Sequence, residues 1–232
     1  MSDLWVFGYG SLIWSPGFRH GAAARAHLPG YHRALCIYSV VYRGSHERPG
    51  LVFGLDHGGY CEGIAFEVPA AFRDETLGYL YDRELTTGAY HARRRMVQLA
   101  DGSGRTVSAL CFIADRAARQ YAGGHSLAEQ AEIVRSSRGR SGRNLDYVLN
   151  TYSHLRDYGI SDRNLMRLIA LVGHHRLIPH GAATCGRSGG APMAILERLN
   201  GVASDRTSGA RRLTPRLPPP PMLRAMVRIK PE

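Results

Sequence analysis

The order of strand-like and helical segments is the feature that most constrains the fold of this chain. Runs rich in β-branched and aromatic residues, divided by glycine and proline, predict strands. Residues 70–86 instead have a helical period, and a second pair of strand-like runs joined by a hairpin turn follows them. One face of this helix carries Leu77, Leu80, Tyr81 and Glu84. The predicted strands are residues 4–7, 30–44, 50–58, 60–69, 90–100 and 105–114.

Three more helices are predicted after residue 125. The first opens with a capping box made by Ser126 and Glu129. The second carries an apolar stripe from Leu145 to Leu155, and the third begins after Asp162 as its N-cap. A strand-rich first part with one inserted helix, followed by a helical last part, indicates an α+β domain.

The last part of the chain differs in composition from the rest. The stretch RRLTPRLPPPP is unsuited to helix or sheet interiors, because proline removes the N–H donors that both need. We therefore expect one domain over residues 1–180 and a disordered, basic, Pro/Arg-rich tail over residues 181–232. A polyproline ligand for a partner domain is the alternative for this tail.

Composition narrows the class of protein and its partners. The formal net charge of +11 suggests nucleic acid, but more than half of it lies in the tail and no binding motif accompanies it. No stretch approaches the roughly 18 apolar residues of a membrane span, and we read no signal peptide. The four cysteines lack C-x-x-C spacing, which is typical of free thiols in a reduced compartment. We expect a cytoplasmic protein without nucleic-acid or membrane partners. The sequence does not determine its oligomeric state.

The segment FGYGSL at residues 7–12 interrupts the first strand with two glycines. It is not a dinucleotide-binding or Walker loop, because the third glycine and any G-K-[ST] are missing. One interpretation is a tight turn after an edge strand. The other is a nest of backbone N–H groups that binds a carboxylate or an oxyanion, with hydroxyl donors from Tyr9 and Ser11.

Glu84 is the strongest candidate for a catalytic group. It lies on the apolar face of its helix and in the last turn, where burial and the helix dipole both raise the pKa of a carboxyl group. A raised pKa suits a general base that works near neutral pH. The alternative is a partly exposed glutamate paired with Arg83 or Arg94.

Other kinds of catalysis find no support in the sequence. The eleven histidines are scattered without metal-ligand spacing, and there is no G-x-S-x-G elbow between a predicted strand and a predicted helix, and no Cys–His context. A carboxylate base facing an anion nest suits proton transfer in an intramolecular rearrangement.

The motifs together resemble one known family. WVFGYGSLIW, RGSHERPGLVFGLDHGG, CEGIAFEVP, YLYDRELTTGAY and SGRNLDYVLNT occur in the order and spacing of the ChaC-like γ-glutamylcyclotransferases, over roughly residues 4–178. The resemblance implies a small mixed β-barrel flanked by helices. It also implies cleavage of glutathione to 5-oxoproline and Cys-Gly, without a cofactor.

The resemblance assigns roles to particular residues. Glu84 falls on the family's catalytic glutamate, although RELTTGAY is longer here than the segment of some members. The implied substrate-binding residues are Gly8, Tyr9, Gly10, Ser11, Leu12, Ile13, Asn144 and Tyr147. Two alternatives stay open: a cyclotransferase for other γ-glutamyl amino acids or amines, and a non-catalytic regulatory or binding protein.

Overall fold

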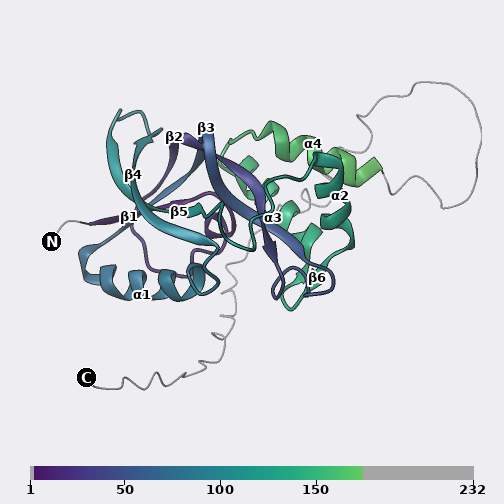
Figure 1. The fold of residues 1–232 in the computed structure, drawn as a ribbon. Helices are drawn as coiled ribbons and strands as arrows, with labels where there is room; N and C mark the ends of the chain where they lie inside the picture. Colours follow the sequence, from purple (N-terminus) through teal and green to yellow (C-terminus); the bar gives the residue numbers. More distant parts are fainter. Residues whose placement is uncertain (1–2, 175–232) are drawn as a thin grey trace, which may run out of the picture. The chain divides into compact units, whose positions relative to one another are not determined.

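A closed β-barrel with helices beside it makes up residues 3–174, the part of the chain that the computed structural model describes (Figure 1). Its strands are β1 (Leu4–Gly8), β2 (Ala23–Ser39), β3 (Gly50–Val68), β4 (Tyr90–Leu99) and β5 (Thr106–Ala114), and a separate short pair is β6 (Arg138–Gly139) with β7 (Gly142–Arg143). The helices are α1 (Arg73–Glu84), α2 (Leu127–Ser136), α3 (Asn144–Asp157) and α4 (Arg163–His174), with short 3-10 turns η1 (Ser11–Ile13) and η2 (Ala70–Phe72). The predicted α+β class is confirmed, whereas the boundary at residue 180, the tail and Cys185 lie outside the described residues.

The barrel is mixed, as the family resemblance implies. Its strand order is β1-β3-β2-β4-β5, and the ring closes through a parallel pairing of β1 with β5 that sets Trp5 opposite Ala109. The neighbouring strands β1–β3, β3–β2, β2–β4 and β4–β5 pair antiparallel. A closed barrel leaves few unpaired sheet edges and surrounds one core. Among its fully buried side chains are Phe7, Phe66, Phe112, Leu28, Leu55 and Ile64.

Two strand predictions need correction. The strand expected at 30–44 begins earlier, at Ala23, and ends at Ser39. The strands expected at 50–58 and 60–69 are one strand, because β2 stays paired with β3 past the glycines at 58 and 59. Those two glycines adopt φ values of 101° and 69°, so they bend the strand locally without ending it.

Helices α2 and α4 begin where their capping residues predict. Ser126 and Glu129 form the reciprocal capping box of α2, and the Asp162 carboxylate accepts from the Leu165 amide at 3.0 Å to cap α4. Helices α2, α3 and α4 pack together beside β3, while α1 lies apart from them at the other side of the barrel (Figure 1). The predicted apolar face of α1 is narrower than expected, because Leu80 is buried but Tyr81 is exposed.

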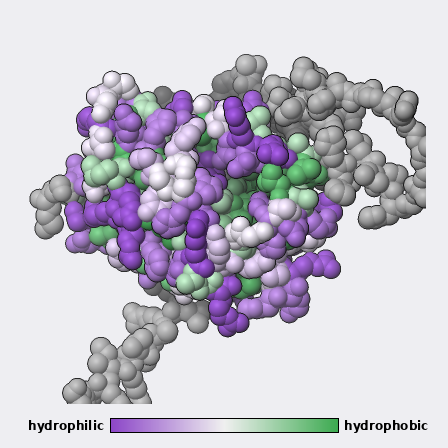
Figure 2. All heavy atoms as spheres, turned by 45° about the horizontal axis from the view of Figure 1, so that its top comes forward, coloured by the Kyte–Doolittle hydropathy of each residue, from purple (hydrophilic) through white to green (hydrophobic). Residues whose placement is uncertain are grey.

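The face of the molecule in Figure 2 is mostly polar, with apolar side chains in small groups. Within residues 3–174, no helix combines the length and the hydrophobicity needed to cross a membrane. Cys36, Cys61 and Cys111 are free thiols in the core, as predicted. Burial raises the pKa of Cys36 to about 12 and that of Cys61 to about 11, so both stay protonated at neutral pH.

Candidate active site

The turn after β1 needs its two glycines for space. A Cβ on Gly8 would lie 3.0 Å from the Phe66 ring, and a Cβ on Gly10 would lie 3.3 Å from the Tyr147 hydroxyl. Neither glycine has a positive φ, and the φ of Gly10 is −135°. The glycines therefore allow close approach of the loop to its neighbours, and the left-handed conformation is not what they supply.

The same turn leaves backbone donors available. The Ile13 amide donates to the Gly10 carbonyl at 3.0 Å, and the Ser15 amide donates to the Ser11 carbonyl at 2.8 Å. Within residues 3–174, no acceptor pairs with the N–H groups of Gly10, Ser11 and Leu12. Consecutive free N–H groups in a turn can form an anion-binding nest.

Glu84 ends helix α1, and its side chain is only 17% exposed. Burial raises the pKa of this carboxyl group, while the Arg83 guanidinium opposes the rise. The Glu84 Oε1 lies 3.0 Å from the Arg83 Nε. Glu84 is therefore largely buried, as predicted, and is also paired with Arg83, whereas its role as a general base stays a prediction.

Arg83 connects this carboxylate to the turn after β1. Its guanidinium donates to the Ser11 hydroxyl at 3.0 Å and to the Ser15 carbonyl at 2.7 Å. It also donates to the Tyr79 hydroxyl at 2.7 Å. One side chain thus fixes Glu84 relative to the loop whose amides are free. Sequence reasoning treated Arg83 only as a possible ion-pair partner and did not foresee this connection.

Asn144 and Tyr147, on the first turn of α3, bind the backbone of β3. The Asn144 side-chain oxygen accepts from the Leu51 amide at 2.7 Å, and its nitrogen donates to the Leu51 carbonyl at 2.6 Å. The Tyr147 hydroxyl accepts from the Phe53 amide at 3.0 Å. Asn144 is wholly buried and fixes β3, whereas the Tyr147 hydroxyl keeps its own proton to donate next to Gly10.

Two more tyrosines, Tyr9 and Tyr90, lie near Glu84. Burial raises the pKa values of Tyr9, Tyr90 and Tyr147, and the nearby Glu84 charge raises each further. The Tyr9 hydroxyl donates to the Phe112 carbonyl at 2.6 Å, so its proton is engaged in a hydrogen bond inside the barrel and is not free to bind a ligand. The Tyr90 hydroxyl donates to the Phe53 carbonyl at 2.9 Å. Tyr90 received no role from the sequence, although it belongs to the quoted segment RELTTGAY.

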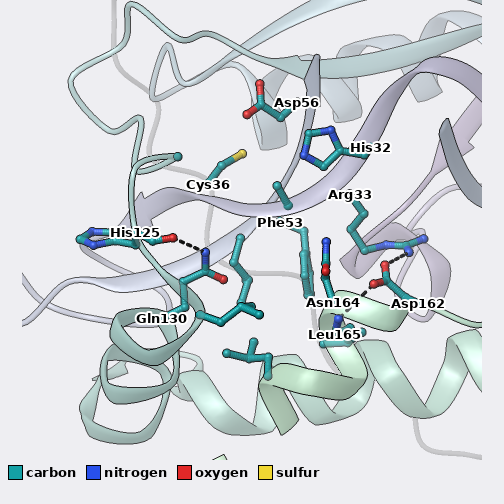
Figure 3. A pocket seen from close by; sticks show the side chains of 15 residues that line it. His32, Arg33, Cys36, Phe53, Asp56, His125, Gln130, Asp162, Asn164 and Leu165 are labelled. Carbon is teal, nitrogen blue, oxygen red and sulfur yellow. Dashed lines mark hydrogen bonds and ion pairs between the residues drawn. The ribbon is translucent and has the colours of Figure 1, made fainter. Parts of the chain in front are cut away.

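A separate cavity of about 210 Å³ lies between β2, β3 and the helices α2 and α4 (Figure 3). Its charged groups are paired, since Arg33 lies 2.7 Å from Asp162 and Asp56 lies 2.7 Å from Arg116. Arg33 also donates to the Tyr9 carbonyl at 2.5 Å, which ties the turn after β1 to the start of α4. The cavity contains none of the residues assigned to the site, and its polar groups support the fold.

Comparison with known proteins identifies the family. The profile of the family described as ChaC-like protein matches residues 4–175. This chain belongs to the ChaC-like family. The resemblance found from the motifs is thereby confirmed, and the matched range includes every candidate site residue.

Relatives of this ChaC-like protein carry specific names. The glutathione-specific γ-glutamylcyclotransferase of Escherichia coli K12 is 32% identical over 169 residues, which is 73% of this chain and 72% of the relative. The human glutathione-specific γ-glutamylcyclotransferase 1 is 31% identical over 174 residues, which is 73% of this chain and 78% of the relative.

A solved structure supports the fold of this ChaC-like chain. The yeast γ-glutamyl cyclotransferase specific to glutathione superposes with a TM-score of 0.70 at 22% identity. The match covers 78% of this chain and 100% of the yeast chain. The closed barrel with its flanking helices is therefore shared with that structure.

Proposed function

We propose that this ChaC-like protein cleaves glutathione by cyclising its γ-glutamyl group, which yields 5-oxoproline and Cys-Gly. The names of its relatives support glutathione as the substrate. The observation that carries the mechanism is the largely buried Glu84 carboxylate, fixed by Arg83 to the loop of free amides. We assign Glu84 as the general base and then the general acid.

The reaction begins with the substrate's own α-amine. Glu84 accepts a proton from the α-ammonium group, and the freed lone pair attacks the γ-carbonyl carbon to form the new C–N bond. The γ-carbonyl oxygen becomes an oxyanion, which the N–H groups of residues 10–12 and the Tyr147 hydroxyl stabilise. The old C–N bond then breaks as Glu84 returns this proton to the departing nitrogen of Cys-Gly. The new ring nitrogen gives its second proton to the freed Glu84 carboxylate, which passes it to the released amine, so Cys-Gly leaves as an ammonium and Glu84 is again ionised.

Orientation supplies much of the acceleration in this proposal. Nucleophile and electrophile belong to one molecule, so the protein has only to hold the γ-glutamyl chain in a curled conformation. Gly8, Leu12 and Ile13 shape the turn, and the Ser11 hydroxyl stays fixed by Arg83. Asn144 acts at a distance by holding β3 against α3. This chemistry requires no cofactor.

We also propose a cellular location and a class of partner for the enzyme. Free buried thiols at Cys36, Cys61 and Cys111 fit a reduced compartment, which supports a cytoplasmic location. We propose a small-molecule substrate as the partner, with no role for nucleic acid or a membrane in the reaction.

The test is a product assay on the purified full chain. Glutathione and γ-Glu-Ala are incubated separately, and both 5-oxoproline and the released amine are quantified by mass spectrometry. We expect equal amounts of 5-oxoproline and Cys-Gly from glutathione, with much slower release from γ-Glu-Ala. Faster cleavage of γ-Glu-Ala would assign the broader γ-glutamyl substrate class, and no 5-oxoproline from either would refute the enzymatic proposal.

A further inference from the structure

A second cation lies beside the candidate site. Arg43 belongs to the segment 40–49 between β2 and β3, and its guanidinium carbon is 5.3 Å from the centre of the Tyr147 ring. The charges of Glu84, Arg43 and Arg83 all act on the Tyr147 hydroxyl. The Arg43 guanidinium is therefore close enough to interact electrostatically with the Tyr147 hydroxyl, which lies next to Gly10.

Among residues 3–174, no carboxylate lies within ion-pair distance of the Arg43 guanidinium. This guanidinium donates to the Ser141 carbonyl, and the nearby Asp146 carboxylate is held by Arg143 at 2.7 Å. Arg33 and Arg83, by contrast, each pair with a carboxylate. Burial lowers the pKa of Arg43, while the nearby Tyr147 and Asp146 side chains oppose this fall. A partly buried cation of this kind is a ready partner for an anionic ligand.

The segment that carries Arg43 is fixed in place. The Arg43 amide donates to the Ser39 hydroxyl at 3.0 Å, and the Ser137 hydroxyl donates to the Pro49 carbonyl at 2.7 Å. The Arg140 amide donates to the Val41 carbonyl at 2.9 Å, which agrees with the place of β6 beside this loop in Figure 1. The guanidinium is therefore presented by a preorganised loop, so little entropy is lost when it binds a ligand.

Glutathione has two carboxylates, one on the γ-glutamyl end and one on the glycine end. The γ-glutamyl end must lie at Glu84 and the free amides of the turn for cyclisation. The contacts of Arg43 are with residues 39 and 141 and with the Tyr147 ring, and none reaches α1 or the turn after β1. A substrate whose γ-glutamyl end is bound in this way would have its leaving Cys-Gly part free to extend toward Arg43.

We propose that Arg43 binds the glycine carboxylate of glutathione and makes this carboxylate a determinant of substrate choice. This inference rests on the proposed function for the direction in which the substrate lies. It explains how the protein distinguishes glutathione from γ-glutamyl compounds whose leaving group ends in a neutral or shorter chain.

The test compares glutathione with its glycine monoethyl ester, in which a neutral and slightly larger ethyl ester replaces the second carboxylate. For the unaltered protein we expect kcat/KM to be about 10- to 100-fold lower with the ester, the scale of one charge-assisted hydrogen-bonded contact. Arg43→Gln should lose a similar factor with glutathione and little with the ester. Arg140→Gln removes the same charge from an exposed position beside the loop and should leave both values unchanged.

Equal losses on both substrates in Arg43→Gln would overturn the proposal and assign Arg43 to the γ-glutamyl end or to the fold of the loop. Equal rates with glutathione and ester in the unaltered protein would overturn it without any variant. Calorimetric binding of both compounds gives a readout that does not need turnover. If glutathione binds more tightly than the ester yet no 5-oxoproline forms, the proposed reaction fails while the Arg43 contact stands.

Discussion

Replacing Asn144 by alanine removes both hydrogen bonds that α3 makes to Leu51. The Leu51 side chain is fully buried, so its amide and carbonyl would lose their partners inside the protein. An unsatisfied buried main-chain group costs about 1–3 kcal/mol, so the two together predict a loss of about 2–6 kcal/mol. Since a typical domain is stable by only about 5–15 kcal/mol, Asn144→Ala should be severely destabilised. Urea unfolding followed by circular dichroism measures the loss.

The control is Asn150→Ala, at an exposed position on the same helix, which should change the stability by less than about 0.5 kcal/mol. A loss below about 1 kcal/mol in Asn144→Ala would refute the reasoning, because it would mean that Leu51 finds other partners. An Asn144→Ala protein of full stability with greatly weakened glutathione binding would instead make Asn144 a direct substrate contact, the role that the family resemblance implied.

Two further substitutions test the surroundings of Glu84. Tyr9→Phe removes the bond to the Phe112 carbonyl, so thermal unfolding should show a loss of about 1–3 kcal/mol while kcat changes little. A large fall in kcat at full stability would mean that the Tyr9 hydroxyl contacts substrate. Arg83→Met should lower kcat by roughly tenfold, which is less than the loss of about 10²–10⁴-fold expected when the general acid–base group itself is removed. It should also raise the pKa of Glu84, so the fall of kcat at low pH should begin at higher pH than in the unaltered protein. A pH profile of kcat that stays in place would contradict the assigned contact.

Local patterns predicted the helices and the character of Glu84 well. The recurrence of Leu77, Leu80 and Glu84 placed that carboxylate toward the apolar side of α1, and it is largely buried. Capping chemistry located the starts of α2 and α4, because a cap depends only on residues three or four positions apart. The exposure of Tyr81 was not predicted, since the period of a helix gives no measure of how wide its packed face is.

Contacts between distant segments could not be predicted from local patterns. The barrel closes through β1 and β5, and only the family resemblance indicated a barrel. The hydrogen bonds of Asn144 and Tyr147 to β3 and of Arg83 to Ser11 also join separate elements, so no local periodicity predicts them. Continuity of β3 through its glycines depends on pairing with β2, which a single segment does not reveal.

Glu84→Gln tests the central claim most directly. The substitution keeps the size of the side chain and an oxygen that accepts from Arg83, but it removes the ability to take up a proton. We expect kcat for 5-oxoproline release from glutathione to fall at least about 10²-fold, while melting temperature and glutathione binding are retained. Glu75→Gln and Asp82→Asn, at exposed positions of the same helix, should keep normal turnover. Glu84→Gln protein that retains most of its turnover would contradict the assignment of Glu84 as the general base.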